Sequence, residues 1–287
     1  MKLISFDRRG VEGVGILDAD ETRVQVIQAR DMLDVITHFQ PDELGSVPIS
    51  GSLDVQDIGI KAPVPHPRRN IFCVGKNYRE HAREFARSGY EAGAVAGAEI
   101  DAYPAVFTKP ASSVIATGEV VDLHRDVTSA VDYEGELAVV IGRGGRNIAK
   151  DRALHHVWGY TIINDVTARD RQKNHKQWFL GKALDTFCPM GPWLVSADEV
   201  DAGNLTLETR VNGELRQYAS TGDLIFDIPT LIEFISAGMS LVPGDIISTG
   251  TPAGVGIGMN PPRFLNSGDI VDIRITGLGL LSNTFAG

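Results

Sequence analysis

The sequence predicts a mainly β protein of the α+β class, with a small N-terminal domain and a larger second domain. From residue 71 onward, short apolar segments recur between Gly and Pro turns, which is typical of a strand-rich domain. Only a few segments have the apolar spacing of a helix. The segment 62–70 (APVPHPRRN) carries three prolines within five positions and predicts an extended linker, so we place the domains at residues 1–65 and 66–287.

The N-terminal part is interpreted as a small α/β cap domain, with strands at residues 2–6, 14–18 and 23–29 and a helix near 31–39. In the second domain, strands are predicted at residues 70–75, 105–110, 118–123, 136–142, 159–165, 205–213, 245–250 and 269–277. Helices are predicted at residues 78–89, 149–157 and 228–238. The segment 88–104 is rich in Ala and Gly and predicts a mobile loop or lid.

Composition and charge restrict the classes of partner. With 43% hydrophobic and 22% charged residues, the chain of 287 residues has the composition of a globular protein with an ample core. A net charge of −10 argues against nucleic acid and anionic membrane surfaces as partners. Cys73 and Cys188 form no CxxC pair, and we find neither a signal peptide nor a long apolar segment. We therefore expect reduced thiols and a cytoplasmic location.

Acidic residues precede one predicted strand at every second position. In VDYEGELAVVI (131–141), Glu134 and Glu136 point to one face because side chains alternate along a strand. Taken alone, the pair fits the solvent-facing half of an amphipathic strand. Asp165 ends another apolar strand and would complete a set of three carboxylates that suits Mg²⁺ or Mn²⁺. Asp132 is not needed for this site and is expected to be exposed.

A histidine and a glutamate lie three positions apart in the predicted helix 78–89. His81 and Glu84 would share one face of that helix. A carboxylate beside an imidazole orients the ring as a general base for water. A surface ion pair on a charged helix explains the same spacing, but the neighbouring lid favours a catalytic dyad that closes over the metal site.

Basic and polar residues near these motifs are candidates for binding a substrate. Lys182 follows the apolar segment QWFLG, which would carry its ammonium group into a pocket. Arg169 and Gln172 are three positions apart and can share a face. Lys109 stands at the end of a predicted strand. A solvated surface charge also explains each of these cations when it is considered alone.

Glycine-rich segments do not match the nucleotide-binding motifs. IGRGGRN (141–147) has Asn147 where a dinucleotide fingerprint has its third glycine. GTPAGVGIG (250–258) has no lysine and is expected to form a tight loop lined by backbone. The GxSxG elbow of serine hydrolases is absent from the sequence.

Five motifs follow one another between residue 71 and the C-terminus: GKNYREHARE, DYEGELAVVIG, GYTIINDVTARD, GKALDTFCPMGP and GDIISTGTPAGVG. This ordered set resembles the fumarylacetoacetate hydrolase family. The resemblance implies a mixed β-sandwich roll, a homodimer, and a Mg²⁺ or Mn²⁺ ion held by Glu134, Glu136 and Asp165. It implies a catalytic dyad of His81 and Glu84, a catalytic lysine at Lys182, and substrate contacts at Arg169, Gln172 and Thr251. We add Lys109 to the predicted substrate-binding residues.

The resemblance is strongest to a branch that includes oxaloacetate decarboxylases, and the wider family includes acylpyruvate hydrolases. It implies metal-dependent cleavage of a C–C bond in a small 2-oxo acid through a pyruvate enolate. One alternative is an isomerase or tautomerase that uses the same enolate on a 2-hydroxydienoate or on oxaloacetate. Another is a non-catalytic homologue that binds a metabolite, but the complete set of site residues favours an enzyme.

Overall fold

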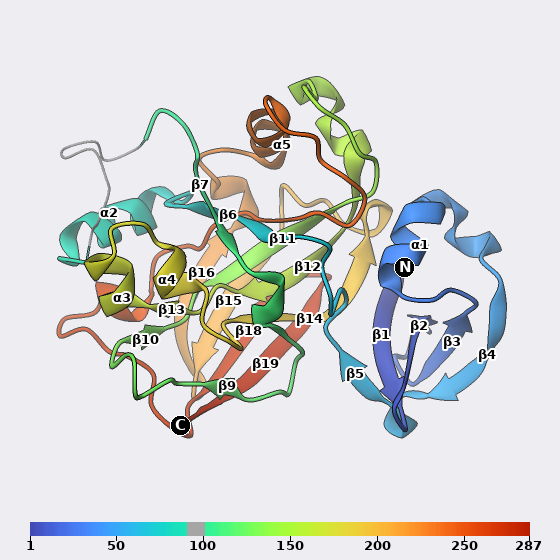
Figure 1. Ribbon diagram of the computed structural model, residues 1–287, viewed down its shortest axis with the longest axis horizontal. Helices are drawn as coiled ribbons and strands as arrows, with labels where there is room; N and C mark the ends of the chain where they lie inside the picture. The colour runs from blue at the N-terminus through green and yellow to red at the C-terminus, as the bar shows by residue number, and fades with distance from the viewer. Residues whose placement is uncertain (91–100) are drawn as a thin grey trace.

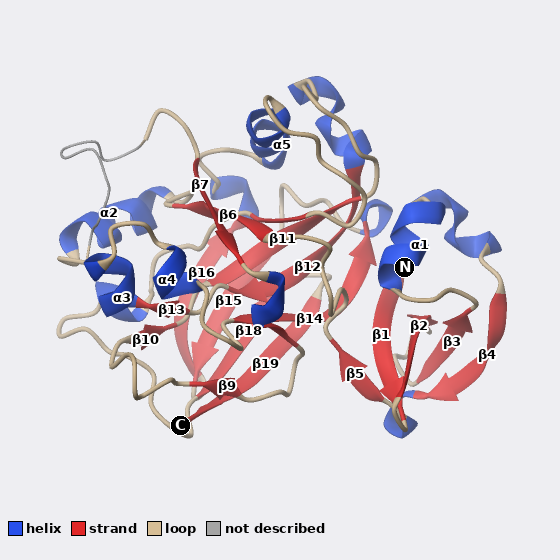
Figure 2. Cartoon of the chain, viewed as in Figure 1, coloured by secondary structure: helices blue, strands red, loops and turns tan. Residues whose placement is uncertain are grey.

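The computed structural model describes residues 1–90 and 101–287 (Figure 1). Strands dominate the architecture, as Figure 2 shows, and this confirms the predicted mainly β class. The predicted lid at 88–104 falls largely outside the described residues. Within the described residues, no helix is both long and apolar enough to span a membrane.

The strands are β1 (Lys2–Arg8), β2 (Val11–Leu17), β3 (Arg23–Ile27), β4 (Ile49–Asp54), β5 (Gly59–Lys61), β6 (Ile71–Gly75), β7 (Ala105–Lys109), β8 (Val114–Ile115), β9 (Val121–Asp122), β10 (Val131–Asp132), β11 (Gly135–Ile141), β12 (Val157–Asn164), β13 (Thr167–Ala168), β14 (Cys188–Ser196), β15 (Thr206–Val211), β16 (Glu214–Ser220), β17 (Ile246–Ser248), β18 (Ile270–Ile275) and β19 (Gly279–Ala286). The α-helices are α1 (Met32–His38), α2 (Arg79–Arg87), α3 (Arg169–Asn174), α4 (Phe179–Lys182) and α5 (Ile228–Ser236). Short 3-10 helices are Pro41–Ser46, Val55–Asp57, Ala111–Ser113, Lys150–His156, Ala197–Glu199, Thr221–Asp223 and Gly256–Gly258.

A large mixed sheet runs through both parts of the chain. Its strand order is β4-β3-β2-β1-β14-β12-β11-β17-β6-β7, with β5 beside β1 and β8 beside β14. A second sheet has the order β16-β15-β18-β19-β9, and it packs against β11, β12 and β14. The main hydrophobic core lies between the two sheets. This arrangement of packed mixed sheets agrees with the predicted sandwich-like roll.

The apolar run of β11 is unbroken because both of its faces are covered. Leu137, Val139 and Ile141 belong to the core between the two sheets. Ala138 and Val140, which point the other way, belong to a second core that includes N-terminal residues. A strand buried on both faces holds its ends rigidly, and the acidic pair of the sequence lies at one of those ends.

The N-terminal part shares both a sheet and a core with the larger part. Strand β1 pairs with β14 through Leu3 and Leu194, and the indole of Trp158 donates a hydrogen bond of 2.7 Å to the carbonyl of Phe39. In Figure 1 the N-terminal strands lie at one end of the molecule, whereas α2, α3 and α4 gather at the opposite end. The domain boundary near residue 65 stays a prediction.

Some elements differ from those predicted. Residues 150–156 form a 3-10 helix in place of the predicted α-helix. Strand β14 was not predicted because Pro189 and Pro192 interrupt its sequence, yet it pairs with β1, β12 and β8. Strands β4, β5, β8, β10, β13, β16 and β19 do not correspond to predicted strands either. The other predicted strands are confirmed, with shifts of a few residues at their ends.

The shared core predicts that the two parts unfold together. Trp158 is fully buried, so we expect Trp158→Ala to lower the free energy of unfolding by about 3–5 kcal/mol in a single transition that includes the N-terminal strands. Urea unfolding followed by circular dichroism and by hydrogen exchange measures both quantities. Tyr218→Ala, at a side chain 67% exposed, is the control and should shift stability by less than about 0.5 kcal/mol. Separate unfolding of the N-terminal strands would contradict this prediction.

Candidate active site

The register of two central strands brings the predicted carboxylates together. Strands β11 and β12 are antiparallel with Gly135 opposite Asn164, so Glu134 and Asp165 flank the same end of this pair. The backbone N–H of Asp165 donates to the carbonyl of Glu134 at 2.8 Å. One carboxylate oxygen from each of Glu134, Glu136 and Asp165 lies within 4.8 Å of the others. All three side chains are buried, so the solvent-exposed interpretation of the acidic pair is excluded.

Two buried lysines neutralise part of this charge. The ammonium group of Lys182 lies 2.8 Å from Glu134 Oε2 and 2.7 Å from Asp165 Oδ2. Lys109 lies 2.7 Å from Asp165 Oδ1 and also donates to the carbonyls of Val166 and Lys182. These three oxygens engage the ammonium group of Lys109, which favours a positioning role over the predicted substrate contact.

Arg169 connects the site to an aspartate whose predicted exposure is wrong. The guanidinium of Arg169 lies 2.7 Å from Glu134 Oε1 and 2.9 Å from Asp132 Oδ2. Asp132 is fully buried, because its carboxylate must hold both Arg169 and two backbone N–H groups of a neighbouring loop. The remaining nitrogen of Arg169, Nη2, is buried without a hydrogen-bond partner among the described residues.

Glu136 differs electrostatically from its neighbour. Burial raises the pKa of Glu134, but Lys182 and Arg169 outweigh this effect and lower that pKa to about 2. For Glu136, burial and the carboxylates of Asp165 and Glu134 together raise the pKa well above its ordinary value. Glu136 accepts hydrogen bonds from Ser248 and from the backbone of Gly250, but within residues 1–90 and 101–287 it has no ion pair with a lysine or arginine.

The glycine-rich segment 250–258 is a backbone cradle for acidic side chains. The N–H of Gly250 donates to Glu136, that of Gly254 to Glu84, and that of Gly256 to Asp132. Its sequence predicted a tight, backbone-lined loop, and the structure shows what the backbone binds. A Cβ atom on Gly258 would lie only 1.8 Å from the Glu84 carboxylate, so a side chain cannot replace glycine there without displacing Glu84.

The predicted dyad forms on the first turns of α2. His81 Nδ1 lies 3.1 Å from Glu84 Oε2, and the ring is 4% exposed. Glu84 is itself fixed by Gly254, so the imidazole is held from behind and its Nε2 is left for the pocket. The buried amide of Asn77, which the sequence did not single out, bonds Thr249 and Phe226 and joins the start of α2 to the cradle.

A small pocket opens onto these groups. It is lined by Val74, Gly75, Lys76, His81, Phe85, Phe107, Glu134, Glu136, Arg169, Gln172, Trp178, Lys182 and Thr251. Seven of the ten predicted site residues therefore face it, and Glu84, Asp165 and Lys109 lie behind the lining. Thr251 uses its hydroxyl within the protein, since it donates to the carbonyl of Gly135 and accepts from Gln217. A larger hollow among the N-terminal strands lies away from the carboxylates.

The donor set fits a hard divalent cation. Three buried carboxylates offer oxygen ligands, which Mg²⁺ and Mn²⁺ prefer. Burial and two neighbouring carboxylates oppose ionisation of Glu136, and it forms no ion pair with a lysine or arginine among the described residues, so a cation at this position would favour its ionised, ligating form. Glu134, Glu136 and Asp165 are the residues that would hold it.

Comparison with known proteins identifies the family. The family model "Fumarylacetoacetate (FAA) hydrolase C-terminal" matches residues 70–286. The chain belongs to the fumarylacetoacetate hydrolase family. It is 54% identical over 243 residues to the oxaloacetate tautomerase YisK of Bacillus subtilis, covering 84% of this chain and 76% of that protein.

Solved structures of this family have the same fold over the whole chain. The fumarylacetoacetate hydrolase from Exiguobacterium antarcticum superposes with a TM-score of 0.85 at 41% identity, covering 100% of this chain and 99% of that one. A 5-carboxymethyl-2-hydroxymuconate delta-isomerase from Mycobacterium smegmatis gives a TM-score of 0.81 at 33% identity, with the same coverage. The named relatives thus include a tautomerase, a hydrolase and an isomerase, and the chain is an enzyme of this family.

The environment of Glu136 predicts how its amide variant behaves. Burial and two neighbouring carboxylates disfavour the ionised form of Glu136, which costs stability at neutral pH, and Glu136→Gln removes this cost, so we expect a higher melting temperature than wild type in EDTA. Because a metal ligand is lost, Mn²⁺ should no longer stabilise the variant, whereas wild type gains about 2.7 kcal/mol when the free Mn²⁺ concentration is about 100 times Kd. Thermal unfolding with and without Mn²⁺ measures both effects. Glu214→Gln, at a side chain 62% exposed, is the control, and undiminished Mn²⁺ stabilisation of Glu136→Gln would refute the metal site.

Proposed function

We propose that this protein uses Mg²⁺ or Mn²⁺ to catalyse keto–enol tautomerisation of a small 2-oxo acid, with a dicarboxylate such as oxaloacetate as substrate. The observation that supports this most directly is Nη2 of Arg169, a buried donor without a hydrogen-bond partner in residues 1–90 and 101–287, beside three carboxylates suited to a divalent cation. Such a donor is costly to bury unless an anionic ligand accepts from it. The name of the relative that shares 54% identity supports oxaloacetate as the substrate. A homodimer and a cytoplasmic location stay predictions.

The charge of the site fits an anionic substrate. Among the described residues, four buried carboxyl groups face three buried cations, which leaves one net negative charge when all four are ionised. A divalent cation would make the balance positive by one, so the loaded site would attract the carboxylate of a 2-oxo acid. The carboxylates are Asp132, Glu134, Glu136 and Asp165, and the cations are Lys109, Arg169 and Lys182.

Each residue facing the pocket has a place in the proposed reaction. Arg169 and Gln172 orient the substrate carboxylate. When bound, the divalent cation polarises the 2-oxo group and stabilises negative charge on its oxygen. His81 removes a proton from C3, so that the C3–H electrons form the C2=C3 double bond and the carbonyl electrons move onto the 2-oxygen.

Lys182 completes the tautomerisation by donating a proton to the 2-oxygen of the substrate. Burial would lower the pKa of Lys182, but Asp165 and Glu134 outweigh burial and raise it, so the group stays charged before the transfer. Its contacts with both carboxylates fix the ammonium group beside the position where the enolate charge develops. Glu84 keeps the His81 ring oriented for the return of its proton to C3 in the reverse reaction.

Cleavage of a C–C bond, the reaction that the sequence predicts first, is the second candidate. The buried dyad of His81 and Glu84 supports acylpyruvate hydrolysis, because such a pair can activate water toward a distal carbonyl. Decarboxylation of oxaloacetate would reach the same enolate by loss of CO₂ and needs neither water nor a base at C3. Release of CO₂ and decay of the enol absorbance, measured in parallel on oxaloacetate and acetylpyruvate, separate these reactions.

Loss of the imidazole should stop tautomerisation without preventing binding. For His81→Gln we expect the tautomerisation rate to fall by about 10²–10⁴, measured by the decay of enol absorbance. Calorimetric binding of oxalate with Mn²⁺ should remain, as should any decarboxylation that wild type shows. His38→Gln, at a side chain 64% exposed, is the control. An equal loss of tautomerisation and oxalate binding would mean that His81 does not act as the base.

The guanidinium of Arg169 should contribute more to ligand binding than its charge alone. Arg169→Lys keeps the charge but removes the unpaired Nη2 donor, so oxalate affinity with Mn²⁺ should fall about 10- to 100-fold, the effect of one charge-assisted hydrogen bond. Arg171→Lys on the same helix, α3, makes the same change outside the pocket and should leave the affinity unchanged. Calorimetry measures both variants, and equal affinities would contradict the role of Arg169.

A further inference from the structure

An indole lines the pocket together with two further aromatic rings. Trp178 lies just before α4 and lines the pocket. Its ring packs edge-on against Phe107 with 5.3 Å between centroids, and against Phe85 with 6.0 Å. The ammonium group of Lys182 lies 5.1 Å from the Phe107 centroid. The contacts therefore lead from the carboxylates through Lys182 and Phe107 to Trp178.

The indole lies directly on the backbone of β6. A Cβ atom on Gly75 would be only 2.1 Å from the Trp178 ring, so the absence of a side chain at Gly75 makes the room that the ring fills. Two aromatic neighbours pack against its edges. The backbone of Gly75 and the two aromatic rings pack against the indole, and this packing restricts its displacement when a longer ligand enters.

The size of the remaining space makes this boundary important. The enclosed space beside the carboxylates is small, so any side chain that lines it restricts the size of a ligand. The carboxylate and 2-oxo oxygens of a bound 2-oxo acid would lie at the site of Glu134, Glu136 and Asp165. Its C3 substituent would then extend away from these residues, toward the aromatic wall formed by Phe85, Phe107 and Trp178. The aromatic wall could therefore distinguish ligands by the length of this substituent.

We propose that Trp178 limits the length of the C3 substituent, so that the pocket accepts short 2-oxo acids and rejects those with long acyl chains. This inference rests on the proposed function, since it assumes that the 2-oxo acid head binds at Glu134, Glu136 and Asp165. It assigns Trp178 as a specificity-determining residue and Gly75 as the residue that positions it.

Oxamate and its N-alkyl derivatives test the proposal by binding alone. Oxamate presents a carboxylate and an adjacent carbonyl, and its N-alkyl chain extends where the C3 substituent would lie. For Trp178→Ala with Mn²⁺, we expect the affinity for N-pentyl oxamate relative to oxamate to rise at least about tenfold over wild type, the effect of admitting methylenes into an apolar pocket. Unchanged relative affinity, measured by calorimetry, would overturn the proposal.

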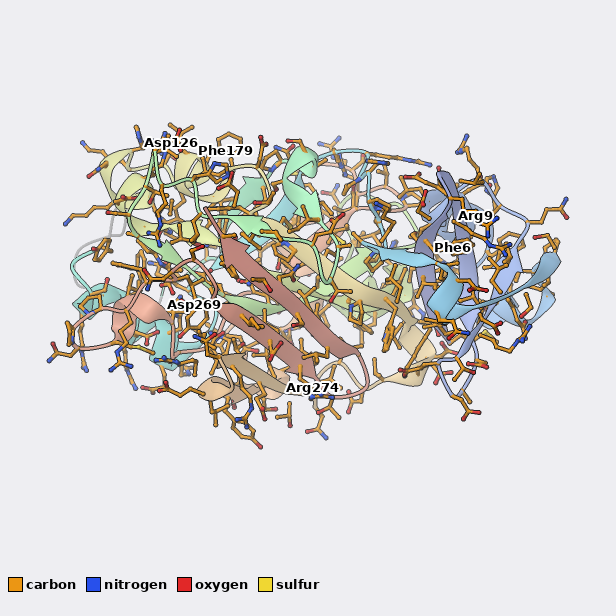
Figure 3. All side chains as sticks on the ribbon, turned by 90° about the horizontal axis from the view of Figure 1, so that it is seen from below. Phe6, Arg9, Asp126, Phe179, Asp269 and Arg274 are labelled. Carbon is orange, nitrogen blue, oxygen red and sulfur yellow. The ribbon has the colours of Figure 1, made fainter. Side chains whose placement is uncertain are left out.

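A control variant and a series of Trp178 variants of different side-chain size accompany this test. Phe179→Ala removes the adjacent aromatic ring, which is 41% exposed, does not line the pocket and is labelled in Figure 3. Phe179→Ala should have the same affinity for N-pentyl oxamate relative to oxamate as wild type. If Trp178→Ala fails to fold, Trp178→Leu and Trp178→Phe should give gains that decrease with side-chain size. A folded series with no gain at any size would contradict the role of Trp178.

The contact between Gly75 and the indole gives an independent test. Gly75→Ala should push the ring into the pocket and weaken oxamate binding in wild type at least about tenfold. In the Trp178→Ala background the same change should have less than about a threefold effect, because the clashing ring is gone. Additive effects of the two changes would contradict the proposed steric mechanism.

Failure of this inference is distinguishable from failure of the proposed function. If wild type with Mn²⁺ does not bind oxamate itself, the proposed 2-oxo acid site is wrong. If wild type binds oxamate and the Trp178 variants keep its selectivity, the site stands and only the length limit is wrong.

Discussion

Burial of several carboxylates in one place is the constraint on which the rest of this structure depends. An ionised carboxylate loses much of its hydration in a protein interior, and like charges nearby raise the cost. Glu134 meets this cost with Lys182 and Arg169, and its pKa stays low. Glu136 has only hydroxyl and backbone donors, and its pKa is raised. The pKa values of these two residues at one strand end are thus shifted in opposite directions. A divalent cation would therefore stabilise the ionised form of Glu136 more than that of Glu134.

The fold supplies the partners of these carboxylates from distant parts of the chain. Strands β11 and β12 hold the acidic residues because their outward faces are sealed by two separate cores. The short helices α3 and α4 bring Arg169 and Lys182 to the same point. The loop after β17 points its backbone N–H groups toward the acidic side chains and donates hydrogen bonds to them. Backbone donors need less space than polar side chains would. Rigid strands and a backbone cradle therefore hold the acidic side chains in position.

Much of this arrangement can be predicted from the sequence. The features that cannot be predicted have a common physical reason. Apolar runs predict buried strands, and the alternation of Glu134 and Glu136 predicts a shared face, because both follow from local geometry. Asp132 belongs to the same alternation, yet its burial depends on Arg169 and on loop amides more than a hundred residues away. Strand β14 is similar: its prolines argue against a strand locally, and its neighbours on both sides decide otherwise. Long-range partners, and not propensity, determine these features.

Tautomerisation and decarboxylation of one 2-oxo acid differ only in which bond at C3 breaks. The bond that breaks must lie perpendicular to the plane of the 2-oxo group, so that its electrons can enter the developing enolate. In the binding mode proposed above, Arg169 and Gln172 would fix that plane by orienting the substrate carboxylate, and the aromatic ring of Trp178 would restrict rotation about the C2–C3 bond. A substituent held in the plane would leave a C–H bond facing His81, whereas a substituent turned out of the plane would expose a C–C bond instead. The residue that limits chain length would thereby also select the proton transfer over the cleavage.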